Sequence, residues 1–268
     1  PGTMGVLAKQ LKLHQQQVIP IPQPSPYTFA QWAAFSVRYV SAWANWQIAE
    51  KCWRAQMPEA DPKQTFVASW GGGVGLAECT LAQHFGYHAL MFASTDERLA
   101  MGRAAGLDML DRRPFFDLYY DAQKYQTDAV YRQRYQEVEA LFVKTLAAHT
   151  NGAGAAIFID NIGDPVFRAT LKALARQGVI ATCGWKHGMQ TTHLRALACI
   201  NRHIHVHTHF ARYAEGVAAV NFAHQTGWMP PINEVYAWDA IPQLAADYEQ
   251  GRIASYFPIF TVDSTNCL

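Results

Sequence analysis

Short apolar runs alternate with segments of helical periodicity through most of the chain. The runs that predict strands are 66–70, 89–94, 108–111, 155–160, 179–184 and 203–210. The segments that predict helices between and after these runs are 74–85, 96–105, 165–177, 189–201 and 212–225. Strands that alternate with helices indicate an α/β fold, in which a parallel, doubly wound sheet has right-handed crossovers and helices on both faces.

Three further segments lie outside this alternation. Thr28 is a good helix N-cap, and residues 28–51 predict a helix rich in aromatic side chains. An insertion at 114–150, rich in Tyr, Gln and charge, separates the third and fourth runs and is expected to be mostly helical. The tail, 227–268, predicts a loop, a helix at 240–250 and a final strand at 256–262.

A glycine-rich turn follows the first predicted strand. It reads Ser69-Trp70-Gly71-Gly72-Gly73-Val74-Gly75. With six strands, this is the pattern of a Rossmann fold, in which the first turn and the next helix N-terminus bind a pyrophosphate. The expected cofactor contacts in the turn are Ser69, Gly72, Gly73, Val74 and Gly75. Two interpretations of Trp70 stay open, since its indole either crowds the pyrophosphate or points away. The turn is also compatible with an ordinary strand-to-helix connection.

The end of the second predicted strand carries hydroxyls and a guanidinium. A carboxylate at this position would bind the ribose 2′-hydroxyl of NAD, whereas the sequence has Ser94 and Thr95, with Arg98 one turn later. These groups suit a 2′-phosphate. The sequence therefore favours NADP(H) as the cofactor, although Thr95 is equally expected to cap the following helix.

Four histidines occupy alternate positions of the last predicted strand, at 203, 205, 207 and 209. Residues two apart share one face of a strand, so the imidazoles are expected to line a single face. No neighbouring cysteine or carboxylate completes a metal-ligand set, and we predict no metal site. His209 lies where the strand meets the crevice of a doubly wound sheet, so it is the predicted catalytic, proton-transferring residue.

Composition narrows the class of protein further. Half of the residues are hydrophobic and 16% are charged, which is typical of a globular protein. The net charge of +1 gives no reason to expect nucleic acid or an anionic membrane as a partner, and no apolar run reaches the length of a membrane-spanning helix. The five cysteines show no C-x-x-C spacing, which favours reduced thiols and a cytoplasmic location.

The order of these motifs resembles a known superfamily. After the turn come Ser94-Thr95-Asp96-Glu97-Arg98, the insertion at 114–150, Asp160-Asn161-Ile162-Gly163-Asp164-Pro165-Val166-Phe167, the stretch 178–184, and Thr208-His209-Phe210-Ala211-Arg212-Tyr213. From residue 11 to residue 268 the pattern resembles the medium-chain dehydrogenase/reductases. It is most similar to their crotonyl-CoA carboxylase/reductase branch, which has a helical insertion at this place, a W-G before the turn and an S-H-F-A-N-Y motif.

The resemblance implies a reaction and further site residues. The branch reduces an α,β-unsaturated acyl thioester with NADPH, and the enolate is captured by CO2 or by a proton. By resemblance, His209 would hold the carboxyl group or its water. Asn161, Gly163 and Gly184 join the expected cofactor contacts in the same way.

The chain departs from this family at two places. The family's β-barrel substrate domain precedes the nucleotide domain, and here only its last strand, near 15–22, is expected. The implied domains are a substrate-domain remnant and linker at 1–27, the Rossmann domain at 28–226 and a returning segment at 227–268. The family's T-G-x-T-A-Y appears as Arg38-Tyr39-Val40-Ser41-Ala42-Trp43, so two large side chains replace the Thr-Gly beside the nicotinamide.

These observations support two principal hypotheses of function. The first is an NADPH-dependent enoyl-thioester reductase acting on an acyl-CoA or acyl carrier protein, with or without carboxylation. Its missing domain is expected either from a partner chain or from residues outside this sequence. The alternative is a non-catalytic relative with weakened cofactor binding, kept as a homodimerisation module through the edge strand at 203–210. A third hypothesis, a decarboxylase or isomerase built on His209, rests on that histidine alone.

Overall fold

The computed structural model describes residues 8–184, 186–187 and 200–262. The chain divides into two compact units, one of Pro1–Val40 with Arg212–Leu268 and the other of Ser41–Ala211. Helix α1 (Phe29–Gln56) contributes its first half to the former unit and its second half to the latter. The domain limits expected at 27/28 and 226/227 both fall within the first of these units.

The larger unit, residues 41–211, is built on a six-stranded sheet in the order β3-β2-β1-β4-β5-β6, with every pair parallel. The strands are β1 (Phe66–Ser69), β2 (His88–Ala93), β3 (Asp108–Asp111), β4 (Ala155–Ile159), β5 (Leu174–Thr182) and β6 (His205–Thr208). This order is that of a full dinucleotide-binding fold, and it confirms the predicted fold class. It places β6 at an edge of the sheet.

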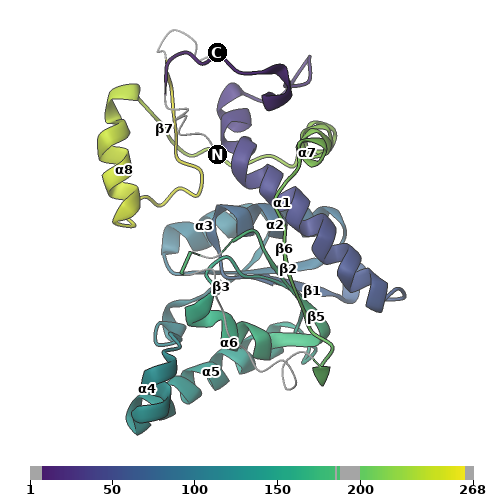
Figure 1. Ribbon diagram of the computed structural model, residues 1–268, viewed down its shortest axis with the longest axis vertical. Coiled ribbons are helices and arrows are strands. Elements are labelled where there is room, and N and C mark those ends of the chain that lie inside the picture. Colours follow the sequence, from purple (N-terminus) through teal and green to yellow (C-terminus); the bar gives the residue numbers. More distant parts are fainter. Residues whose placement is uncertain (1–7, 185, 188–199, 263–268) are drawn as a thin grey trace. The chain divides into compact units, whose positions relative to one another are not determined.

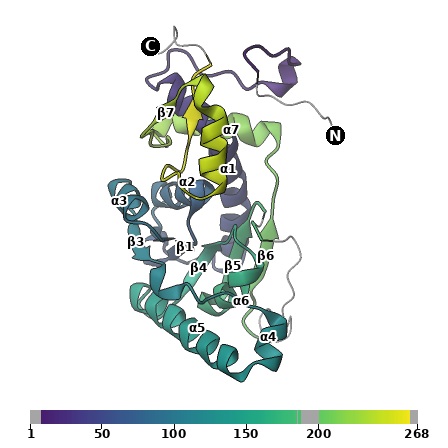
Figure 2. The ribbon, with the colours of Figure 1, turned by 90° about the vertical axis from the view of Figure 1, so that its left-hand side faces the viewer.

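Helices cover both faces of this sheet (Figures 1 and 2). One face carries α2 (Gly72–His84), α3 (Asp96–Ala104) and the second half of α1, which packs Trp46 on Phe85 and Tyr87. The other face carries α5 (Ala129–His149) and α6 (Asp164–Ala173) over a core that includes Phe92, Phe142 and Phe158. The predicted insertion is helical, as η3 (Arg113–Phe115), α4 (Ala122–Thr127) and α5.

Several boundaries differ from the sequence-based expectation. The helix expected to reach residue 177 ends at Ala173, because β5 begins at Leu174 and passes through an irregularity in which Gln177 has a φ of 63°. Strand β6 begins only at His205, since His203 lies in a turn with a φ of 55°. The helix expected at 189–201 lies almost wholly outside the described residues.

The strand expected near 15–22 is not formed. Residues Gln15–Gln17 make a 3₁₀ turn, η1, whose N-cap is His14, and the chain then runs without secondary structure through the following residues. Prolines at 20 and 22 remove two backbone donors that a strand would need, and Val18 is exposed. The prediction that residues near 15–22 form a strand left over from the β-barrel is therefore wrong.

The smaller unit, residues 1–40 and 212–268, is held together by aromatic side chains. Tyr39 lies 4.6 Å from Trp228 and 5.6 Å from Phe257 between ring centroids, and Phe35 contacts the same tryptophan. Around this core lie α7 (Tyr213–Thr226), η5 (Trp238–Ala240), α8 (Ile241–Glu249) and a parallel pair of short strands, β7 (Val235–Tyr236) and β8 (Ile259–Phe260). The final strand expected at 256–262 is thus two residues long.

Candidate functional site

The glycine turn lies at the carboxyl end of β1, where it opens α2. Gly71 and Gly72 have φ angles of 100° and 85°, a region that favours glycine. A Cβ on Gly71 would lie 2.6 Å from the carbonyl oxygen of Phe92, whereas a Cβ on Gly72 would have no atom of another described segment within 4 Å. Gly71 therefore seats the turn against β2, and Gly72 leaves backbone open to an approaching ligand.

The last glycine of the turn brings the helix close to the strand. A Cβ on Gly75 would lie 2.3 Å from Oγ of Ser69, which also accepts a hydrogen bond of 3.2 Å from the backbone N–H of Gly71. Ser69 is fully buried. The serine at the first position of the turn thus allows close packing of α2 on β1. The positively polarised N-terminus of α2 follows directly after this contact.

The indole of Trp70 points away from the turn and into the core. It stacks on Phe142 at 4.6 Å between centroids, and its Nε1 donates a 2.7 Å hydrogen bond to Oγ1 of Thr170 on α6. The side chain is buried. Of the two open interpretations, the structure therefore supports the second, and the tryptophan does not occupy the place of a phosphate.

The tips of β2 and β3 bring together hydroxyls and arginines. Thr95 caps α3 by accepting a hydrogen bond of 3.3 Å from the N–H of Arg98, so the expected capping role is present. Arg113, which sequence reasoning did not select, bonds Asp111 and reaches Asp96 at 2.8 Å, one residue beyond Thr95. Its signal in the sequence was a pair of arginines directly after the third strand.

The tips of β4 and β5 are joined through Asn161. Its Oδ1 accepts hydrogen bonds of 3.1 Å from Oγ1 of Thr182 and from the N–H of Cys183, and Thr182 in turn bonds the backbone of Gly184. The Nδ2 of Asn161 is buried and has no partner among the described residues. A buried amide donor without an acceptor is the kind of group that a bound ligand satisfies.

A buried carboxyl group lies beside these contacts. Asp160 accepts hydrogen bonds of 2.9 Å and 3.0 Å from the N–H groups of Ile162 and Gly163, and another from Thr170. Burial raises the pKa of Asp160 to about 6, although these hydrogen bonds and the nearby Arg112 oppose the shift. Burial likewise lowers the pKa of Arg112, whose guanidinium lies 5.2 Å from the ring centroid of Trp70.

A second buried carboxyl group lies on α2 behind the turn. Glu78 is fully buried and accepts a hydrogen bond of 2.9 Å from Nδ2 of Asn45 on α1. Its other oxygen, Oε2, has no partner among the described residues, and burial raises its pKa well above the ordinary value. Sequence reasoning missed this residue, because a single glutamate in a helix gives no signal of its burial.

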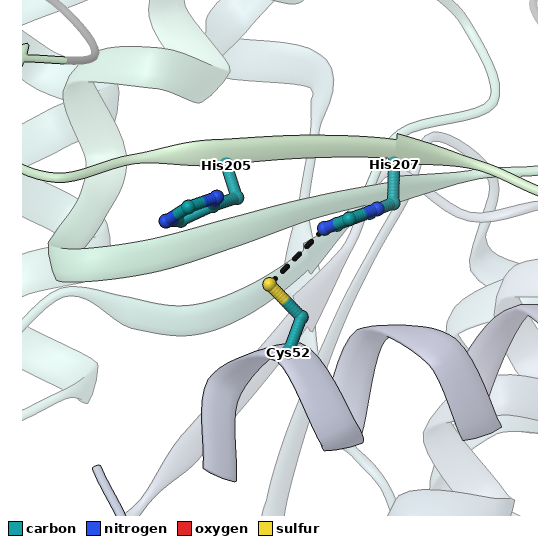
Figure 3. Close-up of side chains that lie close together, drawn as sticks. All are labelled: Cys52, His205 and His207. Carbon is teal, nitrogen blue, oxygen red and sulfur yellow. Dashed lines mark hydrogen bonds between the residues drawn. The ribbon is translucent and has the colours of Figure 1, made fainter. Parts of the chain in front are cut away.

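The histidine strand departs from expectation in two ways. Only His205 and His207 share the face of β6, with nearly parallel rings, while His203 precedes the strand and His209 follows it. The fold also brings Cys52 of α1 to these two imidazoles, as Figure 3 shows. The premise that no cysteine accompanies the histidines was therefore wrong, because it considered only neighbours in the sequence.

The predicted site residues fall into three groups. Ser69, Gly72, Gly73, Val74 and Gly75 form the turn at β1; Ser94, Thr95 and Arg98 lie at the tip of β2; and Asn161, Gly163 and Gly184 lie at the tips of β4 and β5. All three groups are at the carboxyl edge of one sheet, since the strands are parallel. His209 follows β6 at the same edge, where ligands of open α/β sheets bind.

Comparison with solved structures finds the same fold in several known proteins. An NAD-dependent alcohol dehydrogenase is similar over 97% of this chain and 66% of its own, with a TM-score of 0.70 and 20% identity. The crotonyl-CoA carboxylase/reductase AntE, solved with NADP, is similar over 88% of this chain and 56% of its own, with a TM-score of 0.68 and 18% identity. The 2-octenoyl-CoA carboxylase reductase CinF, solved with NADP and 2-octenoyl-CoA, covers 88% and 50%, with a TM-score of 0.66 and 18% identity.

These likenesses establish the fold, which is the one implied by the resemblance to medium-chain dehydrogenase/reductases. The chain spans between half and two thirds of the length of these solved structures. No protein-family model matches the sequence, and no curated protein matches it. Among the described residues, no helix is long and apolar enough to cross a membrane.

Proposed function

We propose that this chain binds NADP(H) and belongs to an oxidoreductase that reduces an enoyl thioester. The observation that carries the proposal is the open glycine turn. Gly72 adopts a φ of 85° with free space where a side chain would be, at the start of a helix and at the carboxyl end of β1. A pyrophosphate needs this combination of accessible backbone N–H groups and positive dipole.

The residues present fit the remaining parts of the cofactor. Ser94, Thr95 and Arg98 lie at the tip of the strand where the adenosine ribose and its 2′-phosphate would be held. The unpartnered Nδ2 of Asn161 would donate to the cofactor from the tip of β4, next to the backbone of Gly163 and Gly184. When bound, the nicotinamide supplies a hydride to an electrophilic carbon of the substrate.

The proposed substrate is an α,β-unsaturated acyl thioester carried by CoA or by an acyl carrier protein. Two solved structures of the same fold are acyl-CoA carboxylase/reductases with NADP, and this chain carries the sequence Thr208-His209-Phe210-Ala211 at the corresponding end of its last strand. His209 would hold the water or the carboxyl group that meets the α-carbon. The remaining wall of the substrate site would come from residues or a partner outside this chain.

The proposal is tested by binding of NADPH to two matched variants. Gly72→Ala places a methyl group in the open turn, whereas Gly152→Ala has the same left-handed φ, at 82°, and the same free space in the turn between α5 and β4. Both variants carry similar backbone strain, so both should lose similar stability, on the order of 1 kcal/mol. Only Gly72→Ala should weaken NADPH binding, by about tenfold or more, in isothermal titration.

Failure to bind NADPH in the folded wild-type protein would overturn the proposal, as would equal loss of binding in both glycine variants. Cofactor preference needs a second pair of variants. Arg98→Ala should weaken NADPH binding by about tenfold and leave NADH binding nearly unchanged, because a charged hydrogen bond to a phosphate is lost. Arg103→Ala, an exposed arginine on the same helix, is the control.

Two observations favour the alternative, a module for assembly. Strand β6 lies at an edge of the sheet that the described residues form, and Tyr39, which replaces the family glycine, is buried in the aromatic core of the smaller unit. A homodimer through β6 that binds neither NADPH nor NADH would support this alternative. Light scattering after size-exclusion chromatography, combined with the titrations above, separates the two functions.

A further inference from the structure

Cys52 lies against two histidines of the edge strand, all within the larger unit (Figure 3). Its Sγ is 3.0 Å from Nε2 of His207. The rings of His205 and His207 are 6.2 Å apart between centroids, with an interplanar angle of 10°. One ligand-type atom from each of the three side chains lies within 4.8 Å of the others.

Two rigid elements produce this arrangement. In β6 the period of two places His205 and His207 on one face. The second half of α1 covers this face, with Ala49 and Trp53 buried, and Cys52 lies beside them on the same turn of the helix. Sites built on a helix and a strand hold their ligands more precisely than sites on loops.

The donor atoms define the chemistry that this cluster suits. A thiolate with two imidazoles is a ligand set for Zn²⁺ and related transition-metal ions, whereas Mg²⁺ and Ca²⁺ prefer oxygen ligands. In tetrahedral coordination, sulfur and nitrogen ligands lie about 3.3–3.6 Å apart. The Cys52–His207 contact of 3.0 Å would widen by about half an ångström, and the other two pairs, which are within 4.8 Å, would close by at most about 1.5 Å.

Access and occupancy are also compatible with an ion. His205 is exposed, and Cys52 and His207 are half-buried, so the cluster is open to solvent on one side. Within the part of the chain that the structure describes, the set comprises these three residues, which leaves one tetrahedral position for a water molecule or an outside ligand. None of the three belongs to the proposed cofactor contacts.

We propose that Cys52, His205 and His207 form a binding site for Zn²⁺ or an ion of similar ligand preference, which joins the second half of α1 to strand β6. Binding forms one metal–sulfur and two metal–nitrogen bonds, and the thiol proton is released to solvent. The site does not depend on the proposed oxidoreductase function, because the cofactor contacts lie on other strands.

The test uses the full chain after chelation and dialysis, titrated with Co²⁺ and then with Zn²⁺. We expect one equivalent of Co²⁺ to give a sulfur-to-cobalt charge-transfer absorption and visible bands typical of tetrahedral coordination, which Zn²⁺ displaces. Zn²⁺ should also raise the melting temperature of the wild-type protein, because it binds the folded state. Cys52→Ser should lose the charge-transfer band and at least a hundredfold in Zn²⁺ affinity, more than the loss of an outer-shell partner costs.

Matched variants separate the site from general metal binding. Cys183→Ser changes another half-buried cysteine and His84→Ala another exposed histidine, and both should bind Co²⁺ as the wild type does. His205→Ala should weaken binding and alter the visible bands. Melting of each metal-free variant shows that it is folded. The proposal is overturned if wild-type protein gives no charge-transfer band, or if the band persists in folded Cys52→Ser.

Discussion

The glycine turn and the histidine strand lie at two strands of one sheet, yet they are assembled in opposite ways. The backbone of the turn is assembled locally, since Ser69, Gly71 and Gly75 contact one another or the adjacent strand β2. The histidine strand acquires its third partner from Cys52, 155 residues away from His207 in the sequence. A motif therefore predicts the first site, whereas only the fold brings the second one together.

The two regions also differ in how tightly they are packed. Ser69, Gly75 and Trp70 are buried and have closely fitted neighbours, while His205 is exposed and, among the described strands, β6 pairs with β5 alone. Substitutions in the turn should consequently change stability, and substitutions at the edge strand should mainly change ligand binding. The following three predictions test the first half of this contrast, in the turn and in helix α2 that follows it.

The largest effect is expected where the helix approaches the strand. Gly75→Ala would place Cβ 2.3 Å from Oγ of buried Ser69, so it should destabilise the protein by about 2–3 kcal/mol despite the better helix propensity of alanine. The second change Ser69→Ala removes that oxygen and should restore about half of the loss. Urea unfolding of the two single variants and the double variant measures this coupling. Additive effects would show that the close approach is not what limits this position.

The next effect concerns the hydrogen bond of the inward-pointing indole. Trp70→Phe removes the donor to Thr170 and should lower the free energy of unfolding by about 1–2 kcal/mol beyond the loss of packing. Trp53→Phe is the matched control, because Trp53 is also buried and its Nε1 has no partner among the described residues. Chemical denaturation of both variants gives the difference. Equal losses in the two variants would contradict the assigned role of the indole.

The smallest effect is a change in pH dependence at Glu78. Because burial raises the pKa of its carboxyl group above that of the unfolded chain, the contribution of Glu78 to stability is present at low pH and is lost as pH rises above about 4.5. Glu78→Gln cannot ionise, so its free energy of unfolding should fall less than that of the wild type between pH 5 and pH 8. Unfolding at both pH values, with exposed Glu97→Gln as control, measures this. A parallel pH dependence in wild type and Glu78→Gln would contradict it.

The sequence predicted the sheet well for a physical reason. Inner strands of this parallel sheet such as β1, β2 and β4 are largely buried on both faces and therefore appear as continuous apolar runs. The α/β alternation was consequently visible in order. The run Val18-Ile19-Pro20-Ile21 looked similar, but no strand pairs with it in the described part of the chain, and a strand needs a partner. The hydrophobic pattern shows that a segment is apolar, but it does not show which other segment pairs with it.

The candidate site could be predicted only where its residues are contiguous. The turn, the tip of β2 and the position of His209 after β6 followed from motifs and strand ends. Arg113, Glu78 and Cys52 did not, because their significance depends on burial or on contacts between distant segments. The direction of the Trp70 side chain could not be predicted from the sequence either. The alternation of residues along a strand shows which residues share a face but not what packs against that face.

The inward orientation of the Trp70 side chain also has a consequence for related chains. Its Nε1 donates to Thr170, and Thr170 donates to Asp160, which in turn accepts the N–H groups at the tip of β4. One polar relay thus crosses the core from the end of β1 to the end of β4. Trp70, Thr170 and Asp160 should therefore covary during evolution. A homologue with a different residue at position 70 is expected to have other residues in place of Thr170 and Asp160 as well. The glycines of the turn are expected to be retained whether or not position 70 changes.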